Sequence, residues 1–319
     1  MKLGDFHKTK HFFWLILKLT IVIACVYFIY LRLITNSSFS SSQLWETLRL
    51  QNLLSFNNLL ILIGFSLANW LLEIKKWQTL VSSIESISFV EATKQSLSSL
   101  TTSLITPNRI GEYGAKILYF KPAVRSKILL LNLFGNLSQL LTTLVFGSLG
   151  FIYLNSATNR FGNYQYSLYI SFGIAILVGI SYFYLVTKQP LYKGKTFKDL
   201  TFFIKEIPKK ILSLSLFLAV FRFLVFSHQF VFLLAIFDYQ IPYWIAISSI
   251  SLMYLVASLI PMLSLFDALL KGSVALAIFS QFSDNEVGVL MITLLMWLLN
   301  FAIPSVFGSY FVLTFKIKK

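Results

Sequence analysis

Residues 188–210 read KQPLYKGKTFKDLTFFIKEIPKK, and residues 211–237, which follow directly, read ILSLSLFLAVFRFLVFSHQFVFLLAIF. The first segment is rich in lysine, whereas the second is apolar over more than the roughly 20 residues that a helix needs to cross a bilayer. A basic loop beside a long apolar run is typical of a membrane protein at its cytosolic surface. The same alternation recurs along the chain and predicts a polytopic membrane protein.

The composition argues against a soluble protein. Of the 319 residues, 57% are hydrophobic and 12% are charged, and the mean hydropathy is +0.76. Soluble domains carry about 25% charged residues. Because backbone polar groups cannot stay unpaired in lipid, each crossing must be helical. We therefore expect an all-α fold, a polytopic membrane helical bundle, in which residues 1–319 form a single integral membrane domain.

Several runs are apolar enough to cross the membrane. They are 12–34, 58–74, 128–154, 166–187, 211–237, 242–262 and 287–315, with a shorter run at 264–281. The first run is too long for a signal peptide, so we expect a retained helix. The basic segment 188–210 separates two halves, 12–187 and 211–315.

The lysines and arginines predict the orientation of these runs. Of the 27, 21 lie in 1–11, 75–127, 188–210 and 316–319. Placing these ranges in the cytosol gives about eight crossings with both termini inside (N-in/C-in), in the cytoplasmic (inner) membrane. The net charge of +15 then faces acidic lipid rather than nucleic acid, since no basic helix or RNA-binding aromatic motif is present.

Segment 86–106, SISFVEATKQSLSSLTTSLIT, is amphipathic. Its apolar residues fall at helical spacings and share one face, and the remainder is mostly Ser and Thr. This pattern favours a helix in a polar protein interior or a re-entrant arm. The alternative is a helix lying on the cytosolic membrane surface.

A break follows this segment at Pro107, which lacks an N–H and ends the preceding helix. Asn108 can cap the helix that begins next, and Gly111 allows close backbone approach. Free N–H groups at a helix start, with Arg109 beside them, form a candidate phosphate site. The alternative is an ordinary cytosolic turn.

Two acid–lysine pairs stand at matching places in the chain. Glu112 and Lys116 are four residues apart after Pro107, and Asp267 and Lys271 are four apart after Pro261. Such pairs share a helix face, and charges within an apolar stretch usually face a partner or a cavity. Interrupted segments in corresponding halves indicate a transporter's binding site. Chance is the alternative explanation of the parallel.

Arg222 lies in the middle of the run 211–237, too deep to reach either surface easily, so we expect it to face the bundle interior. It either binds substrate there or only locks helices together. His228 fits a packing role. At the end of run 58–74, Lys75, Lys76 and Trp77 are typical of an anchor at the membrane interface.

Motifs for other chemistry are missing from the sequence. There is no G-x-x-x-x-G-K-[ST], no H-E-x-x-H, no Cys/His metal spacing and no G-x-S-x-G. We therefore expect no cofactor, no metal and no catalytic residue. Cys25 is the only cysteine, which excludes an intrachain disulfide.

The run Thr106-Pro107-x-Arg109-Ile110-Gly111-Glu112, with Lys116 after it, resembles a signature of the transmembrane (flippase-like) domain of lysylphosphatidylglycerol synthases and its stand-alone relatives. The resemblance covers roughly 12–315. A second signature of that family is matched only in part, by Pro261 and Lys271, so the chain resembles a divergent member. Because no soluble aminoacyltransferase domain follows, we do not expect it to make the lysyl-lipid itself.

The resemblance implies a lipid flippase-like protein that moves a polar or anionic-headgroup lipid between leaflets. The expected binding residues are Pro107, Asn108, Arg109, Gly111, Glu112, Lys116, Arg222, Pro261, Asp267 and Lys271. The expected partners are membrane lipid headgroups, with a homo-oligomer or a partner lipid synthase left open. The alternatives are an intramembrane lipid- or glycolipid-modifying enzyme, with Glu112 as base, and an accessory scaffold for a partner synthase.

Overall fold

The computed structural model describes residues 55–104, 106, 109–158, 206–260, 266–283 and 285–315, and the single positions 20, 23, 27, 29, 30, 53 and 173. Within this part of the chain the regular elements are all helices, so the all-α fold is confirmed. Apart from those single positions, the expected crossings 12–34 and 166–187 lie outside the described residues, as do most of 188–210, Pro107, Asn108 and Pro261.

The helices follow one another in chain order. They are α3 (Phe56–Val81), α4 (Phe89–Leu104), α5 (Ile110–Leu118), α6 (Arg125–Thr158), α9 (Lys209–Ile236), α10 (Tyr243–Leu259), α11 (Asp267–Phe279), α12 (Glu286–Trp297), the π-helical turn η4 (Leu298–Ala302) and α13 (Ile303–Leu313).

Four helices are long and apolar enough to cross a membrane: α3, α6, α9 and the continuous helix that α12, η4 and α13 form together. They coincide with the expected crossings 58–74, 128–154, 211–237 and 287–315. The remaining two expected crossings in the described part are helical too, as α10 and α11. At 13 residues, α11 is about 20 Å long, less than the roughly 30 Å of a hydrocarbon core. The expectation that 264–281 crosses alone is therefore not supported.

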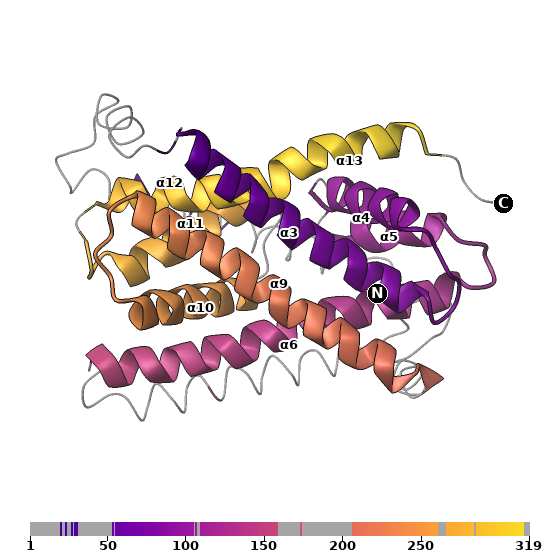
Figure 1. The fold of residues 1–319 in the computed structure, drawn as a ribbon, viewed down its shortest axis with the longest axis horizontal. Helices are drawn as coiled ribbons and strands as arrows, with labels where there is room; N and C mark the ends of the chain where they lie inside the picture. The colour runs from indigo at the N-terminus through magenta and orange to yellow at the C-terminus, as the bar shows by residue number, and fades with distance from the viewer. Residues whose placement is uncertain are drawn as a thin grey trace, which may run out of the picture.

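The crossing helices run between two ends of the bundle. Figure 1 shows that α3 ends, α6 begins, α9 begins and α13 ends at one end, on the right of the view. Since α4 and α5 lie between α3 and α6 in the chain, this pair enters and leaves at that end. The pair α10 and α11, between α9 and α12, enters and leaves at the opposite end. The fold thus contains two helical hairpins that reach inward from opposite ends.

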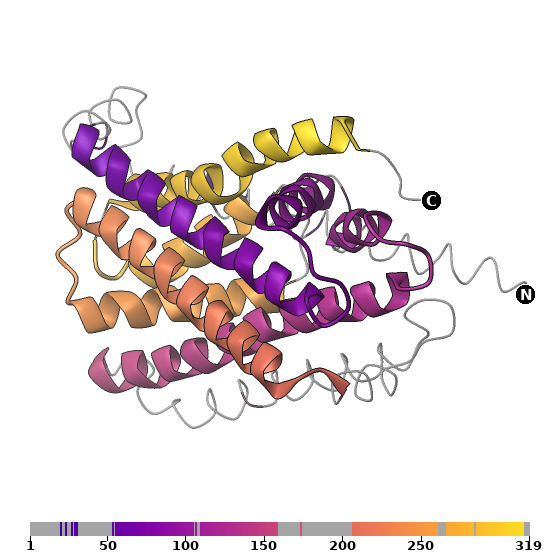
Figure 2. The ribbon, with the colours of Figure 1, turned by 45° about the vertical axis from the view of Figure 1, so that its right-hand side comes forward.

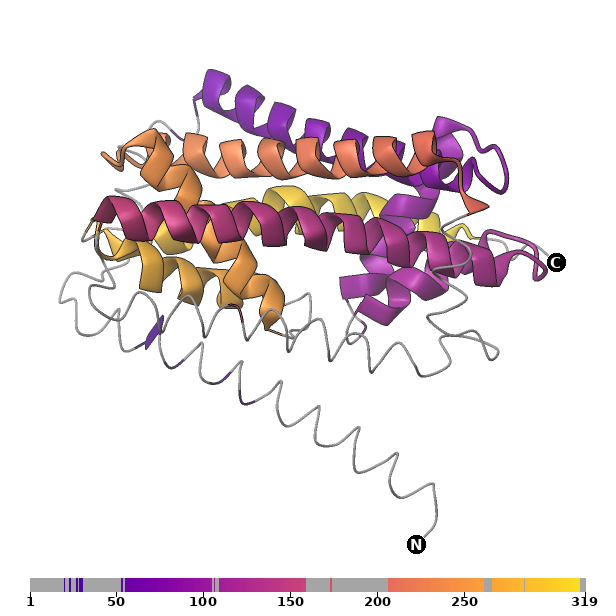
Figure 3. The ribbon, with the colours of Figure 1, turned by 90° about the horizontal axis from the view of Figure 1, so that it is seen from below.

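Close packing joins the helices in pairs. α3 lies beside α9, and α10 lies beside α6, as Figures 1 and 3 show. A Cβ at Gly147 of α6 would collide with Leu255 of α10, and one at Gly150 would lie 2.7 Å from the carbonyl oxygen of Ser248. Such small residues let membrane helices approach closely. Helix α4 packs against both α5 and α13 (Figure 2).

The outward faces of the long helices are apolar. On α3, Leu60 and Leu67 are exposed, and on α13 so are Val306, Phe307 and Tyr310. A soluble monomer rarely exposes contiguous apolar surface of this kind. These faces are suited to lipid, in keeping with a membrane protein.

Helix α4 turns its polar side inward. It begins at a capping box, in which Ser88 N donates to Glu91 Oε2 at 3.1 Å and Glu91 N donates to Ser88 Oγ at 3.2 Å. The buried residues include Gln95, Ser96 and Ser99, whereas Val90 is exposed. The serine stripe therefore faces a polar protein interior, the first of the two interpretations of this segment. Whether α4 enters the membrane stays a prediction.

Candidate functional site

The first hairpin is closed by contacts between α4 and the start of α5. Gly111 N donates to Thr106 Oγ1 at 2.8 Å, and Thr102 Oγ1 donates to Gly111 O at 2.9 Å. A Cβ on Gly111 would collide with the Thr102 carbonyl. Glycine at 111 is therefore required by packing. Arg109, just before α5, has a φ of 57°, in the left-handed region that an L-residue occupies only at a cost of about 1–2 kcal/mol.

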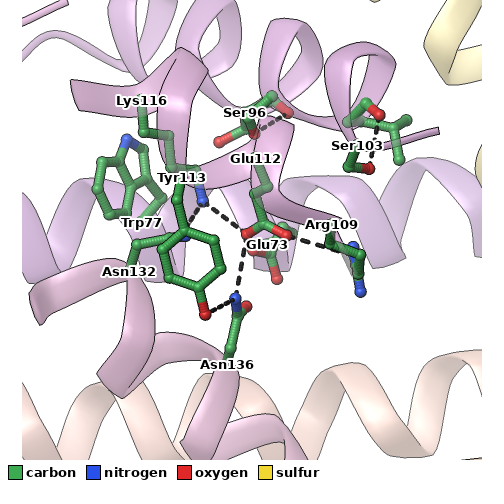
Figure 4. Close-up of polar contacts among 12 residues, drawn as sticks. Glu73, Trp77, Ser96, Ser103, Arg109, Glu112, Tyr113, Lys116, Asn132 and Asn136 are labelled. Atoms are coloured by element: carbon green, nitrogen blue, oxygen red, sulfur yellow. Dashed lines mark hydrogen bonds and ion pairs between the residues drawn. The ribbon is translucent and has the colours of Figure 1, made fainter. Parts of the chain in front are cut away.

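Glu112 is the centre of a buried polar cluster (Figure 4). Its Oε1 lies 3.3 Å from Lys116 Nζ and accepts from Asn136 Nδ2 at 3.4 Å, and its Oε2 lies 3.4 Å from Arg109 Nε. Lys116 Nζ also donates to Asn132 Oδ1 at 2.6 Å. The Glu112 and Lys116 side chains are 6% and 3% exposed. The pair predicted from the sequence forms, but it is buried rather than solvated.

The charge state of Glu112 follows from these neighbours. Two cations, Lys116 and Arg109, lie beside this buried carboxylate, and opposite charges at such short distances favour its ionised form.

Arg222 faces the bundle interior, as expected, and binds α3. Its NH1 lies 2.7 Å from Glu73 Oε2, and its Nε donates to Asn69 Oδ1 at 2.9 Å. Glu73 also pairs with Lys76 at 2.7 Å. This part of α3 thus carries a carboxylate shared by two cations, one of them from another helix.

The membrane anchor predicted at the end of α3 is wrong for two of its three residues. Lys75 is exposed, but Lys76 and Trp77 are buried, at 2% and 1% exposed. Trp77 Nε1 donates to Gln95 Oε1 at 2.7 Å, and its ring lies 4.3 Å below Lys116 Nζ. Contacts with α4 and α5 therefore draw this segment into the protein.

A chain of amides continues from Arg222 to the π-helical turn η4. Asn69 Nδ2 donates to Asn300 Oδ1 at 2.8 Å, and Asn300 Nδ2 donates to Gln229 Oε1 at 2.9 Å. Pro304 has no N–H, so the carbonyl of Asn300 lacks the donor it would meet in a regular helix. Trp70 Nε1 donates to that oxygen at 3.1 Å. These bonds form a polar bridge from the π-helical turn to α3 and α9.

The second acid–lysine pair resembles the first. Lys271 Nζ lies 2.7 Å from Asp267 Oδ2 in the first turns of α11. Lys271 also lies over the rings of Tyr254, at 5.4 Å, and Phe301, at 5.2 Å. In both pairs a lysine thus meets an acid four residues earlier and an aromatic ring. Cation–π contacts of this kind are worth about 0.5–2 kcal/mol each.

Two adjoining cavities lie where the hairpins meet. The first, of about 290 Å³, has apolar walls that include Phe226, Phe230 and Met253, and is called the apolar cavity below. The second, of about 240 Å³, includes Ser96 and Ser99, and is called the serine cavity. Both are lined by Arg109, Gln139, Thr143, Arg222, Ser258 and Phe301, which form the shared wall.

The surroundings of the two cavities are positively charged. The basic residues are Lys76, Arg109, Lys116, Arg222 and Lys271, and the acidic ones are Glu73, Glu112 and Asp267. Five cations against three carboxylates leave a net charge of +2. Because Arg109 and Arg222 both stand in the shared wall, an anion placed there would meet two guanidinium groups.

The structure brings six of the ten residues predicted for binding to the two adjoining cavities. Arg109 and Arg222 line both, Glu112 and Lys116 line the serine cavity, and Asp267 and Lys271 line the apolar cavity. Gly111 packs behind them against α4. Pro107, Asn108 and Pro261 lie outside the described residues.

Several residues that line the cavities were not predicted from the sequence, among them Asn69, Glu73 and Gln139. A signal was present for two of these, since Asn69 and Glu73 are polar residues four apart within an apolar run. Polar groups in a crossing usually mark a functional or paired site.

Among the described residues no group of three or more His, Cys, Asp or Glu side chains is placed to hold a metal ion. A comparison with known protein families finds no match for this chain, and a comparison with curated proteins finds none either.

Proposed function

We propose that this chain is a multi-pass, flippase-like protein of the cytoplasmic membrane, which binds a lipid with a polar or anionic headgroup and moves it between the leaflets. It would be a divergent relative of the transmembrane domain of lysylphosphatidylglycerol synthases. The observation that carries the proposal is the pair of adjoining cavities, which share a wall containing Arg109 and Arg222.

The two cavities suit the two parts of a lipid. The apolar cavity offers aromatic and aliphatic walls to the start of the acyl chains, and the shared wall offers guanidinium groups to a phosphate. The shared wall lies between two hairpins that enter from opposite ends. This position supports alternating access, because a small movement of either hairpin would open the site toward one end.

The proposed topology keeps both termini in the cytosol and revises the number of full crossings. Four crossings are α3, α6, α9 and the helix from α12 to α13, and two more are the runs 12–34 and 166–187. The α4–α5 hairpin would enter from the cytosol and the α10–α11 hairpin from outside. Each hairpin returns to the side from which it enters, so only the six full crossings change the side of the chain. Six is an even number, and both termini therefore stay inside (N-in/C-in).

Arg109→Ala tests the proposal. The Arg109 side chain is 48% exposed and belongs to no helix interior, so its loss should spare the fold. We expect the outer-leaflet share of the transported lipid to fall to that of cells lacking the protein, measured by leaflet-resolved labelling of membrane lipids. Lys75→Ala removes an exposed cation from α3 outside both cavities and is the matched control. An unchanged lipid distribution in Arg109→Ala, at equal protein level, would contradict the proposal.

A further inference from the structure

The serine cavity contains buried polar atoms that have no hydrogen-bond partner among the described residues. They are Ser96 Oγ and Gln139 Nε2; Glu112 Oε2 likewise accepts no hydrogen bond, although it forms an ion pair with Arg109 Nε at 3.4 Å. All three residues line this cavity, and Ser96 and Glu112 are 3% and 5% exposed. Burying a polar group without a partner is destabilising. Two unpartnered groups and a carboxylate oxygen that accepts no hydrogen bond, all around one cavity, indicate a ligand that supplies both donors and acceptors.

The charges around the serine cavity restrict which lipid headgroup can bind in it. Its two carboxylates are each paired with two cations: Glu73 with Lys76 and Arg222, and Glu112 with Lys116 and Arg109. No carboxylate of the cluster is left to balance a further positive charge, and the surroundings are already net positive. An ammonium group would therefore be repelled here.

Hydroxyl groups fit the same cavity without a charge penalty. A hydroxyl both donates and accepts, so it can donate to Glu112 Oε2 and accept from Gln139 Nε2, while Ser96 Oγ can do either. Ser99, Asn136 and Trp70, which also line the cavity, add polar atoms and an indole of the sort that contacts polyols.

We propose that the serine cavity recognises a neutral, hydroxyl-rich headgroup, such as a sugar or another polyol, of a lipid whose phosphate lies at the shared wall. This rests on the proposed function and names its substrate class. The phosphate meets Arg109 and Arg222, the polyol extends into the serine cavity, and the acyl chains leave through the apolar cavity.

The test is a lipid titration of the purified full chain in detergent, followed by tryptophan fluorescence, because Trp70 and Trp297 line the two cavities. We expect phosphatidylinositol to bind at least about fivefold more tightly than phosphatidate, since one hydrogen bond to a buried group is worth about that factor. Phosphatidylethanolamine, which carries an ammonium group, should bind more weakly than phosphatidate. Water-soluble inositol phosphate should bind more weakly than the lipid.

Two serines of α4 provide a matched pair of variants. Ser96→Ala removes the unpartnered hydroxyl and should lower the affinity for phosphatidylinositol about fivefold. Ser103 is equally buried, but its Oγ donates to Leu100 O at 2.7 Å and it lines neither cavity. Ser103→Ala should therefore leave the affinity unchanged. Figure 4 shows the two side chains on the same helix.

The outcomes separate this inference from the proposed function. If none of the lipids binds, the lipid site itself is wrong. If phosphatidate and phosphatidylinositol bind equally, or phosphatidylethanolamine binds best, the anion site stands and the polyol headgroup is overturned. If inositol phosphate binds as tightly as the lipid, the ligand is a free sugar phosphate rather than a lipid.

Discussion

Glu73 shows how a single side chain organises the centre of the bundle. It lies between Lys76 of its own helix and Arg222 of α9, and each nitrogen is 2.7 Å away. Removing one partner of a buried ion pair leaves an uncompensated charge, which costs more than the pair contributes. The residue is therefore a structural link between α3 and α9 as well as a wall of the serine cavity.

Glu73→Gln should accordingly destabilise the protein by about 3–5 kcal/mol, because two cations lose their shared carboxylate. The measurement is thermal unfolding in detergent. Glu85→Gln changes an exposed carboxylate beyond the end of α3 and should leave the unfolding temperature unchanged. Equal unfolding temperatures for both variants would show that Glu73 holds no buried cation.

For single residues, the sequence identifies the charged motifs but not all of their partners. Glu112–Lys116 and Asp267–Lys271 are visible as pairs four residues apart, because helix geometry is local. The roles of Lys76 and Trp77 are not visible, since a Lys-Lys-Trp after an apolar run is typical of an interface anchor. Their burial depends on Gln95 and Lys116, which reach them only through tertiary packing.

The α4–α5 hairpin places the cluster, and it depends on one close approach between backbones. Gly111 allows the start of α5 to lie against the Thr102 carbonyl of α4. The sequence indicates this break through Pro107 and the amphipathic pattern of 86–106. It does not indicate that the serine side of α4 faces inward, because an exposed and an internal polar face have the same spacing.

Gly111→Ala should separate α5 from α4, because the added Cβ would overlap a backbone carbonyl that cannot move aside. We expect weaker lipid binding in the same fluorescence titration, together with a lower unfolding temperature. Gly114 provides the control, since nothing lies within 4 Å of a Cβ built there. Gly114→Ala should be neutral or stabilising by up to about 1 kcal/mol, as expected for a helix interior. Identical behaviour of the two variants would contradict the packing role of Gly111.

The whole molecule has a basic end and an opposite end that lacks lysine and arginine among the described residues. Lys121, Arg125, Lys127, Lys209 and Lys210 belong to the segments at the first end, whereas Asp238 and Glu286 belong to those at the second. The sequence predicts this asymmetry from residue counts alone. It does not predict that α10 and α11 form a hairpin, because an apolar run of the length of 264–281 is ambiguous between a crossing and a half-crossing.

Cysteine labelling tests this orientation in a Cys25→Ser background. Asp238→Cys should react with a membrane-impermeant maleimide in intact spheroplasts, because the proposal places the α9–α10 connection outside. Lys121→Cys, in the connection before α6, should react only after the membrane is permeabilised. Both positions are exposed, so labelling depends on the side of the membrane. The reverse pattern would invert the topology.

The π-helical turn at Leu298–Ala302 gives the last helix an unusual freedom. A π turn holds about one residue more than an α turn, so winding this turn to α would rotate α13 relative to α12 by about 100°. Gly308 now lies against the backbone of Leu97 in α4, and the rotation would turn it away without breaking the helix. Rewinding this one turn would therefore change the contact between α13 and α4 while the helix stays continuous.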